Sequence, residues 1–217
     1  MTPPQEHHER QRYIYVVRHG QTEENERGLH QGQGIGGQLS TQGARDTHEL
    51  GPRLAGIAFD SLYVSPAARC QATAEILREY LAAIPDVRTD KRLDAKNSGH
   101  LAGRPRELAA AEAARAGVPI HRHRVPGGET SEEVQARYVA LWDDLCGGPA
   151  RRVLLVGHGG GIACLLLHLA RRLFSDYLDH VPGSAALSLL RVPETTSRGE
   201  IVLMNVSPRE VGSELPV

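Results

Sequence analysis

The sequence of 217 residues has no apolar run long enough to cross a bilayer, and its polar first twelve residues contain no apolar signal core. Its formal net charge is only -1, and no basic stripe with interleaved aromatic residues favours nucleic-acid binding. Its three cysteines have no paired spacing, which argues against a disulfide framework. We therefore expect a protein of the cytoplasm, with neither a membrane nor a nucleic acid as partner.

The length fits one domain that can bury a sizeable core. We expect a disordered arm over residues 1–12, a single domain over 13–206 and a flexible tail over 207–217. The sequence leaves the oligomeric state open, a homodimer included.

Apolar periodicity predicts an alternation of strands and helices. The predicted strands cover 13–17, 59–64, part of 84–95, 152–156, 185–192 and 201–206. The predicted helices cover 40–55, 67–81, about 105–116, about 130–146 and 159–174. This order predicts a three-layer α/β/α domain with a mostly parallel sheet and a terminal hairpin. The irregular segment at about 96–130 is expected to be an insert that covers the site.

Arginine and histidine follow three of the predicted strands. Arg18 and His19 end the first strand, Arg69 comes shortly after the second, and His158 follows the apolar run at 153–156. Ligands of open α/β sheets bind beyond the carboxyl ends of strands, so these side chains would meet there. Fixed cations and histidines, with no cysteine motif, indicate phosphate chemistry with a histidine nucleophile.

Four motifs around these residues resemble those of the histidine phosphatase (phosphoglycerate mutase-like) superfamily, in the same order. They are Arg18-His19-Gly20-x-Thr22-x-x-Asn25, Ser65-Pro66-x-x-Arg69, Pro126-Gly127-Gly128-Glu129-Thr130 and Gly157-His158-Gly159-Gly160. The resemblance covers about residues 13–206. It implies a phosphatase whose histidine carries the phosphoryl group.

The resemblance also implies a role for each matching residue. His19 would be the nucleophile, and Arg18 and Arg69 would clamp the phosphate. His158 would donate a hydrogen bond to a transferring oxygen. The residues expected to touch phosphate or fix its loop are Thr22, Asn25, Gln31, Gly32 and Gly159. No cofactor or metal is expected.

The sequence departs from the family pattern at the general acid. The family's L-x-E and G-x-W-E-G segments correspond here to Leu93-Asp94-Ala95 and Gly99-His100-Leu101-Ala102-Gly103. Ala95 and Ala102 thus replace the two glutamates. Asp94 is the first candidate for a substitute acid and Glu129 the second, because a helix start tends to keep Glu129 ionised. The family usually has an arginine two residues before the residue that corresponds to Gln31. In this sequence that position is Leu29.

The insert adds two ambiguous groups. His121-x-His123 has a metal-ligand spacing without a nearby third ligand, so we interpret it as a solvated or substrate-facing segment. We expect the arginines of the insert either to contact an anionic substrate or to form a solvated basic face. These arginines are Arg104, Arg106, Arg122 and Arg124.

These observations favour a metal-independent phosphatase acting on a small phosphorylated metabolite. The alternatives are a phosphoglycerate mutase-like phosphotransferase and a phosphate-binding protein with little turnover. The sequence does not identify the substrate.

Overall fold

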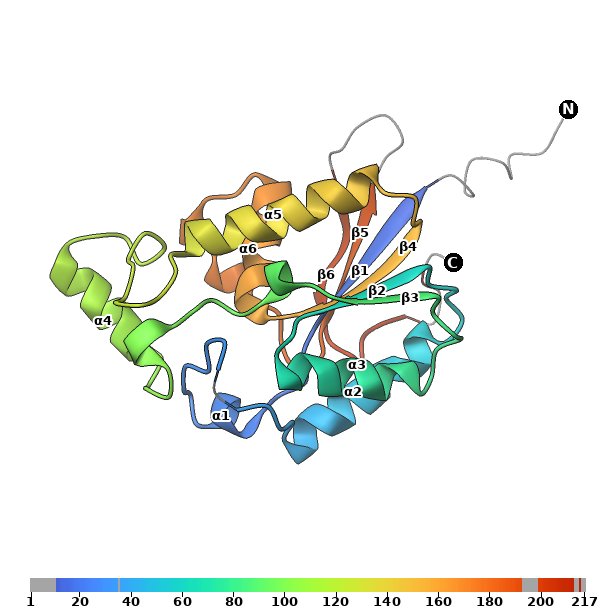
Figure 1. The fold of residues 1–217 in the computed structure, drawn as a ribbon, viewed down its shortest axis with the longest axis horizontal. Helices are drawn as coiled ribbons and strands as arrows, with labels where there is room; N and C mark the ends of the chain where they lie inside the picture. The colour runs from blue at the N-terminus through green and yellow to red at the C-terminus, as the bar shows by residue number, and fades with distance from the viewer. Residues whose placement is uncertain (1–10, 35, 193–198, 213–214, 216–217) are drawn as a thin grey trace, which may run out of the picture.

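In the computed structural model, which describes residues 11–34, 36–192, 199–212 and 215, the predicted three-layer α/β/α fold is confirmed (Figure 1). The sheet has six strands in the order β3-β2-β4-β1-β5-β6. Their bounds are β1 Arg12–Arg18, β2 Ser61–Val64, β3 Asp86–Thr89, β4 Arg152–Gly157, β5 Leu187–Val192 and β6 Glu200–Val206. Residues 1–10 of the arm expected over 1–12 lie outside the described residues, whereas Arg12 is not in a disordered arm but begins β1.

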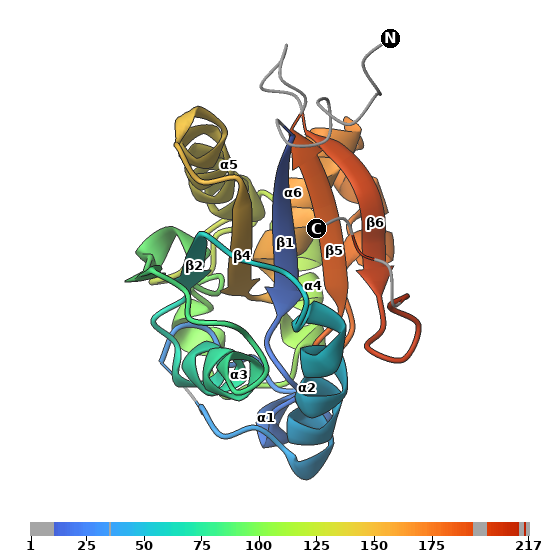
Figure 2. The same cartoon turned by 90° about the vertical axis from the view of Figure 1, so that its right-hand side faces the viewer.

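The sheet is mixed, with its parallel part on one side. The pairs β1–β4, β2–β4 and β2–β3 are parallel, whereas β1–β5 and β5–β6 are antiparallel. Figure 2 shows this order, with the β5–β6 hairpin at one edge of the sheet. Four neighbouring strands therefore end at the same edge, where ligands of α/β sheets bind.

Helices cover both faces of the sheet. Their bounds are α1 Glu23–Glu26, α2 Thr41–Leu54, α3 Ala68–Arg78, α4 Glu107–Ala116, α5 Ser131–Gly147 and α6 Gly159–Ala170. Leu50, Leu54 and Leu77 of α2 and α3 belong to one buried cluster. Tyr138 and Leu166 of α5 and α6 belong to the other. The strand β4 is buried on both faces, which explains its uniformly apolar sequence.

The C-terminal part of the chain differs from expectation in two places. The last long helix ends at Ala170 rather than 174, because Arg171 adopts a left-handed conformation with φ 55 and closes the helix. No glycine marks this stop. The tail was expected to be flexible, but Val211 and Leu215 are buried against the α2–α3 side of the sheet.

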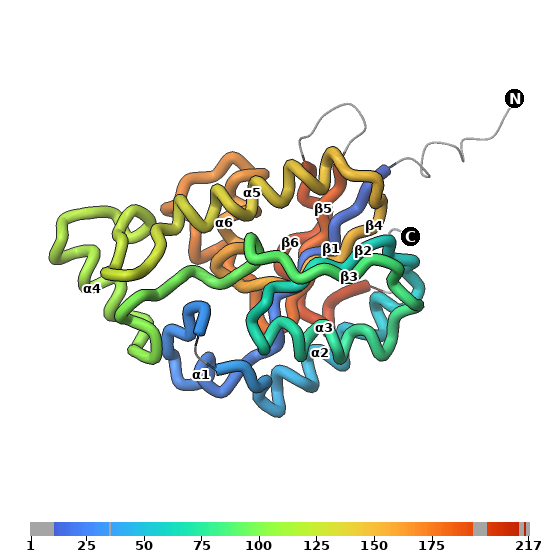
Figure 3. The backbone as a smooth tube through the Cα atoms, viewed as in Figure 1, coloured from blue at the N-terminus to red at the C-terminus, as the bar shows by residue number. Residues whose placement is uncertain are grey.

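The insert lies beside the glycine-rich loop that follows α1. Leu29 pairs with Pro105, His30 N donates to Arg104 O at 2.8 Å, and Gly103 N donates to His30 O at 2.7 Å. Figure 3 traces the insert, with α4 at its outer end, beyond the carboxyl ends of the parallel strands. These backbone bonds fix the insert to the loop. Within the described ranges, no helix has the length and hydrophobicity needed to span a bilayer.

Candidate active site

Strand register brings the two histidines together. In the parallel β1–β4 pair Arg18 is opposite Gly157, so the next residues, His19 and His158, emerge side by side. Their ring centroids are 5.2 Å apart. Both side chains are buried. The structure thus joins two motifs that are about 140 residues apart in sequence.

His19 has a defined tautomer. Its Nδ1 lies 2.7 Å from the Gly20 carbonyl oxygen, which can only accept, so Nδ1 donates and the lone pair of the neutral ring is on Nε2. Burial, followed by the positive charges of Arg18 and Arg69, holds the pKa of His19 well below its usual value. A Cβ at position 20 would lie 2.6 Å from Gly43 O, which explains the glycine after His19. The ring is therefore neutral, as a nucleophile requires.

Arg18 has unused donor capacity. Its Nη1 donates to the Pro182 carbonyl, whereas its buried Nε has no hydrogen-bond partner among the described residues. The side chain lies against Gly159, where a Cβ would approach Arg18 Nε to 3.3 Å. Burial, followed by the charge of Arg106, lowers the pKa of Arg18 to about 10, so it remains a cation at neutral pH. A buried unpaired donor beside a helix N-terminus is suited to an anion.

Arg69 lies in the first turn of α3 and is buried to 2% exposure. Its Nη2 donates to Gly32 O at 2.8 Å and lies 3.2 Å from His158 Nδ1. Gly32 has φ 56, a left-handed conformation that favours glycine. The glycine loop and the second arginine are thus locked together.

Thr22 and Asn25 organise the loop after His19. Thr22 is the N-cap of α1, and its side chain forms a capping box with Asn25. Asn25 Nδ2 donates to Gln31 Oε1 at 2.9 Å, and Gln31 Nε2 donates to Glu24 Oε2 at 3.0 Å. These hydrogen bonds hold the segment before Gly32 in place. They fit the expectation that Thr22, Asn25 and Gln31 fix this loop.

His158 is the N-cap of α6, but its side chain does not cap that helix. Instead, Nε2 lies 2.9 Å from Ser65 Oγ, and Ser65 Oγ donates to Asp94 Oδ1 at 2.9 Å. Burial, followed by the positive charge on neighbouring groups, lowers the pKa of His158. Asp94 therefore lies behind His158, linked to it through Ser65.

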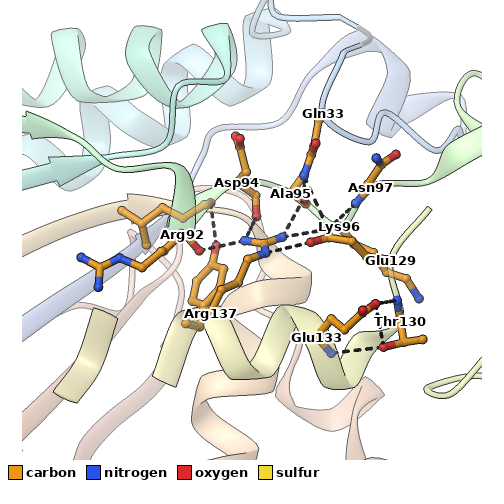
Figure 4. A network of polar contacts seen from close by, with 12 residues as sticks. Gln33, Arg92, Asp94, Ala95, Lys96, Asn97, Glu129, Thr130, Glu133 and Arg137 are labelled. Atoms are coloured by element: carbon orange, nitrogen blue, oxygen red, sulfur yellow. Dashed lines mark hydrogen bonds and ion pairs between the residues drawn. The ribbon is translucent and has the colours of Figure 1, made fainter. Parts of the chain in front are cut away.

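Glu129 is held by Arg137 of α5. Arg137 contacts both carboxylate oxygens at 3.2 Å and also donates to Asp94 O and Ala95 O. Asn97 N donates to Glu129 Oε2 at 2.7 Å. Figure 4 shows Arg137 at the centre of these contacts, with the Ala95 carbonyl directed toward it.

The chain matches the model of the histidine phosphatase superfamily, branch 1, over residues 14–207. It belongs to this superfamily. It is 34% identical over 135 residues to fructose-2,6-bisphosphatase TIGAR of Xenopus tropicalis, covering 61% of this chain and 49% of the relative. It thus spans about half the length of that relative.

Two further relatives match over most of their length. The 2,3-bisphosphoglycerate-dependent phosphoglycerate mutase of Azorhizobium caulinodans is 29% identical over 171 residues, covering 74% of this chain and 82% of the mutase. The solved structure of a mycobacterial glucosyl-3-phosphoglycerate phosphatase is 28% identical with a TM-score of 0.73, covering 91% of this chain and all of that one (100%). The superfamily thus includes phosphatase and mutase relatives of this chain.

The insert of this superfamily member separates its arginines into two groups. Arg122 and Arg124 pair with Glu132 and Glu133 at the start of α5. Arg106 Nε donates to Leu29 O at 3.2 Å, on the side of the insert that contacts the glycine loop. Its charge also contributes to the lowered pKa of Arg18. The charge of Arg106 therefore acts on Arg18.

The two insert histidines do not share a site. His121 stacks on Phe174 with centroids 4.7 Å apart, whereas His123 Nε2 lies 3.7 Å from Glu112 Oε2. Across the described part of the chain, no three histidine, cysteine, aspartate or glutamate side chains are grouped as a metal site.

The hydrogen-bond contacts of Ser65 and Arg137 in the site were not predicted from the sequence. Ser65 belonged to a quoted motif, but nothing in its spacing indicated contact with His158. Arg137 is one of several charged residues on an amphipathic helix, and its acceptors are backbone carbonyls. Backbone carbonyls carry no sequence signal, so this contact could not be predicted.

Proposed function

We propose that this superfamily member is a phosphatase that acts on a small phosphorylated metabolite through a phosphohistidine on His19. His19 Nε2 would attack phosphorus while Arg18 and Arg69 hold the equatorial oxygens. Water would then cleave the N–P bond and release phosphate. The charge is balanced by arginine and histidine, so the proposed reaction needs no metal.

The observation that carries this proposal is the pairing of a tautomerically fixed His19 with an arginine whose buried donor is unsatisfied. The Gly20 carbonyl fixes the lone pair on Nε2. The Nε of Arg18 has no hydrogen-bond partner in the described chain, and a phosphoryl oxygen would provide one. Fixed donors of this kind are the main source of phosphoryl-transfer catalysis.

The alanine at position 95 indicates which phosphorylated substrates would react well. Ala95 cannot protonate a leaving group, Glu129 is paired with Arg137, and Asp94 is linked to Ser65. General acid catalysis typically contributes about 10²–10⁴-fold. We therefore propose a preference for aryl phosphates, acyl phosphates, phosphoramidates or diphosphates, whose leaving groups need little protonation.

Two alternatives remain as outcomes of the same experiment. The similarity to a mutase favours testing phosphoglycerate isomerisation. The alanine at position 95 favours testing a phosphate-binding protein with little turnover.

The deciding experiment is hydrolysis of p-nitrophenyl phosphate, with and without EDTA, followed by a panel of phosphorylated metabolites. We expect EDTA-resistant hydrolysis. Phosphate binding without hydrolysis would support the binding protein, and net transfer between phosphoglycerates would support the mutase. Inhibition by EDTA that a divalent ion reverses would contradict metal independence.

A further inference from the structure

A line of hydrogen bonds runs from His158 through Ser65 to Asp94. His158 Nε2 lies 2.9 Å from Ser65 Oγ, and Ser65 Oγ lies 2.9 Å from Asp94 Oδ1. His158 follows β4, Ser65 follows β2 and Asp94 follows β3. The parallel register of three adjacent strands therefore assembles this line.

The proton positions in this line follow from Arg69, which has only donors. Its Nη2 lies 3.2 Å from His158 Nδ1, so Nδ1 accepts and the neutral ring carries its proton on Nε2. That proton is donated to Ser65 Oγ, which also accepts from Ala67 N at 3.2 Å. The single proton of Ser65 is then directed to Asp94 Oδ1. Asp94 Oδ1 is therefore the final acceptor, and burial raises the pKa of this carboxyl group.

This protonation state is unsuited to a bound phosphoryl group. The oxygens of a phosphate dianion accept hydrogen bonds, and a bare Nδ1 also accepts. A phosphoryl group beside Arg69 would therefore need a proton on Nδ1. The resulting imidazolium would be buried, where an uncompensated charge is costly.

We propose that Ser65 and Asp94 position His158 and balance its charge, so that Nδ1 takes up a proton when a phosphoryl group binds and donates it in a hydrogen bond to a phosphoryl oxygen. The inference rests on the proposed function, because it places the phosphoryl group between Arg69 and His158. It assigns Asp94 as a positioning residue that acts through Ser65. The leaving group takes no proton from Asp94 in this arrangement.

The groups around His158 explain why Nδ1 is protonated only when a phosphoryl group is bound. The charged or titratable groups that act on it are Arg18 and His19 from β1 and its end, Arg69 and Cys70 from α3, and Arg137 and Tyr138 from α5. Burial raises the pKa of the Cys70 thiol to about 12, so it remains neutral. Asp94 is the carboxylate linked to the ring, and the dianion supplies the remaining negative charge.

The test uses nuclear magnetic resonance of the histidine ring nitrogens in the full chain, with and without inorganic phosphate. We expect His158 to be neutral and protonated on Nε2 when free, and doubly protonated when phosphate is bound. In Ser65→Ala and Asp94→Asn the second protonation should be lost. Ser61→Ala is the matched control, since Ser61 on the same strand donates to Asp86 at 3.3 Å, at the end of β2 away from Ser65.

Kinetics give the second readout. Loss of one transition-state donor should lower kcat for p-nitrophenyl phosphate on the order of 10²-fold in Ser65→Ala and Asp94→Asn. Ser61→Ala should retain the wild-type kcat. Neutral His158 in the phosphate complex would overturn the proposal, and so would unchanged kcat and ring protonation in either folded variant. The resonance experiment needs no turnover. A protein that is inactive but still protonates His158 when phosphate binds would therefore contradict the phosphatase and support the proposed protonation of His158.

Discussion

Two regions of the site differ in how closely they follow the superfamily pattern. At the ends of β1 and β4, the motif residues are present and lie together: Arg18 beside Gly159, and His19 beside His158. Along residues 93–103, Ala95 and Ala102 occupy the positions where the resemblance led us to expect glutamate. In the proposed mechanism, different segments of the chain would thus bind the phosphate and protonate the leaving group.

The second region is nevertheless well ordered. Arg137 donates to the carbonyl groups of Arg92, Asp94 and Ala95, and it pairs with Glu129. These bonds keep the backbone of residues 92–95 in place although position 95 is an alanine. The backbone at position 95 is therefore fixed, and a glutamate introduced there tests the comparison.

The largest expected effect is at the nucleophile. His19→Ala should lower turnover by about 10⁴-fold or more while the fold persists, because the covalent step loses its nitrogen. Rapid-quench labelling of the wild type should place acid-labile, base-stable phosphate on His19. The exposed His48→Ala variant is the control and should react normally. Label on serine, aspartate or cysteine would contradict the mechanism.

The clamp comes next. Arg18→Ala and Arg69→Ala should each lower kcat/KM on the order of 10²–10³-fold, the cost of one transition-state donor. The lysine variants should fall between wild type and alanine, since lysine keeps the charge and loses the planar fork. Steady-state kinetics with p-nitrophenyl phosphate measure this. Near wild-type rates in either alanine variant would remove that arginine from the clamp.

Restoring the acid should sharpen the contrast between the two regions. Ala95→Glu should raise turnover of alkyl phosphates by about 10²-fold and change aryl phosphate turnover little, because only a basic leaving group needs the proton. Ala95→Gln is the control for size without acidity. The measurement is the dependence of rate on leaving-group pKa in each variant. A flat dependence in the wild type that steepens in Asp94→Asn or Glu129→Gln would identify an acid already present.

The pH profile tests the environment of His19. Because burial and two arginines lower its pKa, the ring stays unprotonated when the pH falls through the ordinary histidine value of about 6.5. Labelling of His19 should therefore persist below that pH and fail only at a more acidic one. A half-maximal labelling rate near pH 6.5 would show that the ring is not shielded in this way.

The smallest expected effect is in the insert. Arg106→Gln should raise KM about two- to fivefold for substrates with a second anionic group, the size of one exposed ion pair, and leave kcat unchanged. Arg122→Gln is the matched control, because Arg122 is paired with Glu132 at 2.8 Å. The effect should shrink as salt increases. Equal KM values for both variants would place Arg106 on a solvated face.

The sequence by itself determined the layers of the fold, the positions of Arg18, His19 and His158 at strand ends, and that of Arg69 shortly after a strand. Each rests on a local pattern: an apolar run that predicts a strand, followed by a polar motif. Parallel pairing does the rest, since adjacent strands that end at one edge must present such motifs to one another.

Only the tertiary structure decided the link from Asp94 through Ser65 to His158, the capture of Glu129 by Arg137 and the burial of Val211. Each depends on a contact between distant segments, and several acceptors of Arg137 are backbone carbonyls that every residue possesses. Likewise, α6 ends at a left-handed Arg171, where the sequence has no glycine that would predict the end of the helix. Local patterns therefore specify where reactive groups emerge, whereas packing specifies their hydrogen-bond partners and hence their proton states.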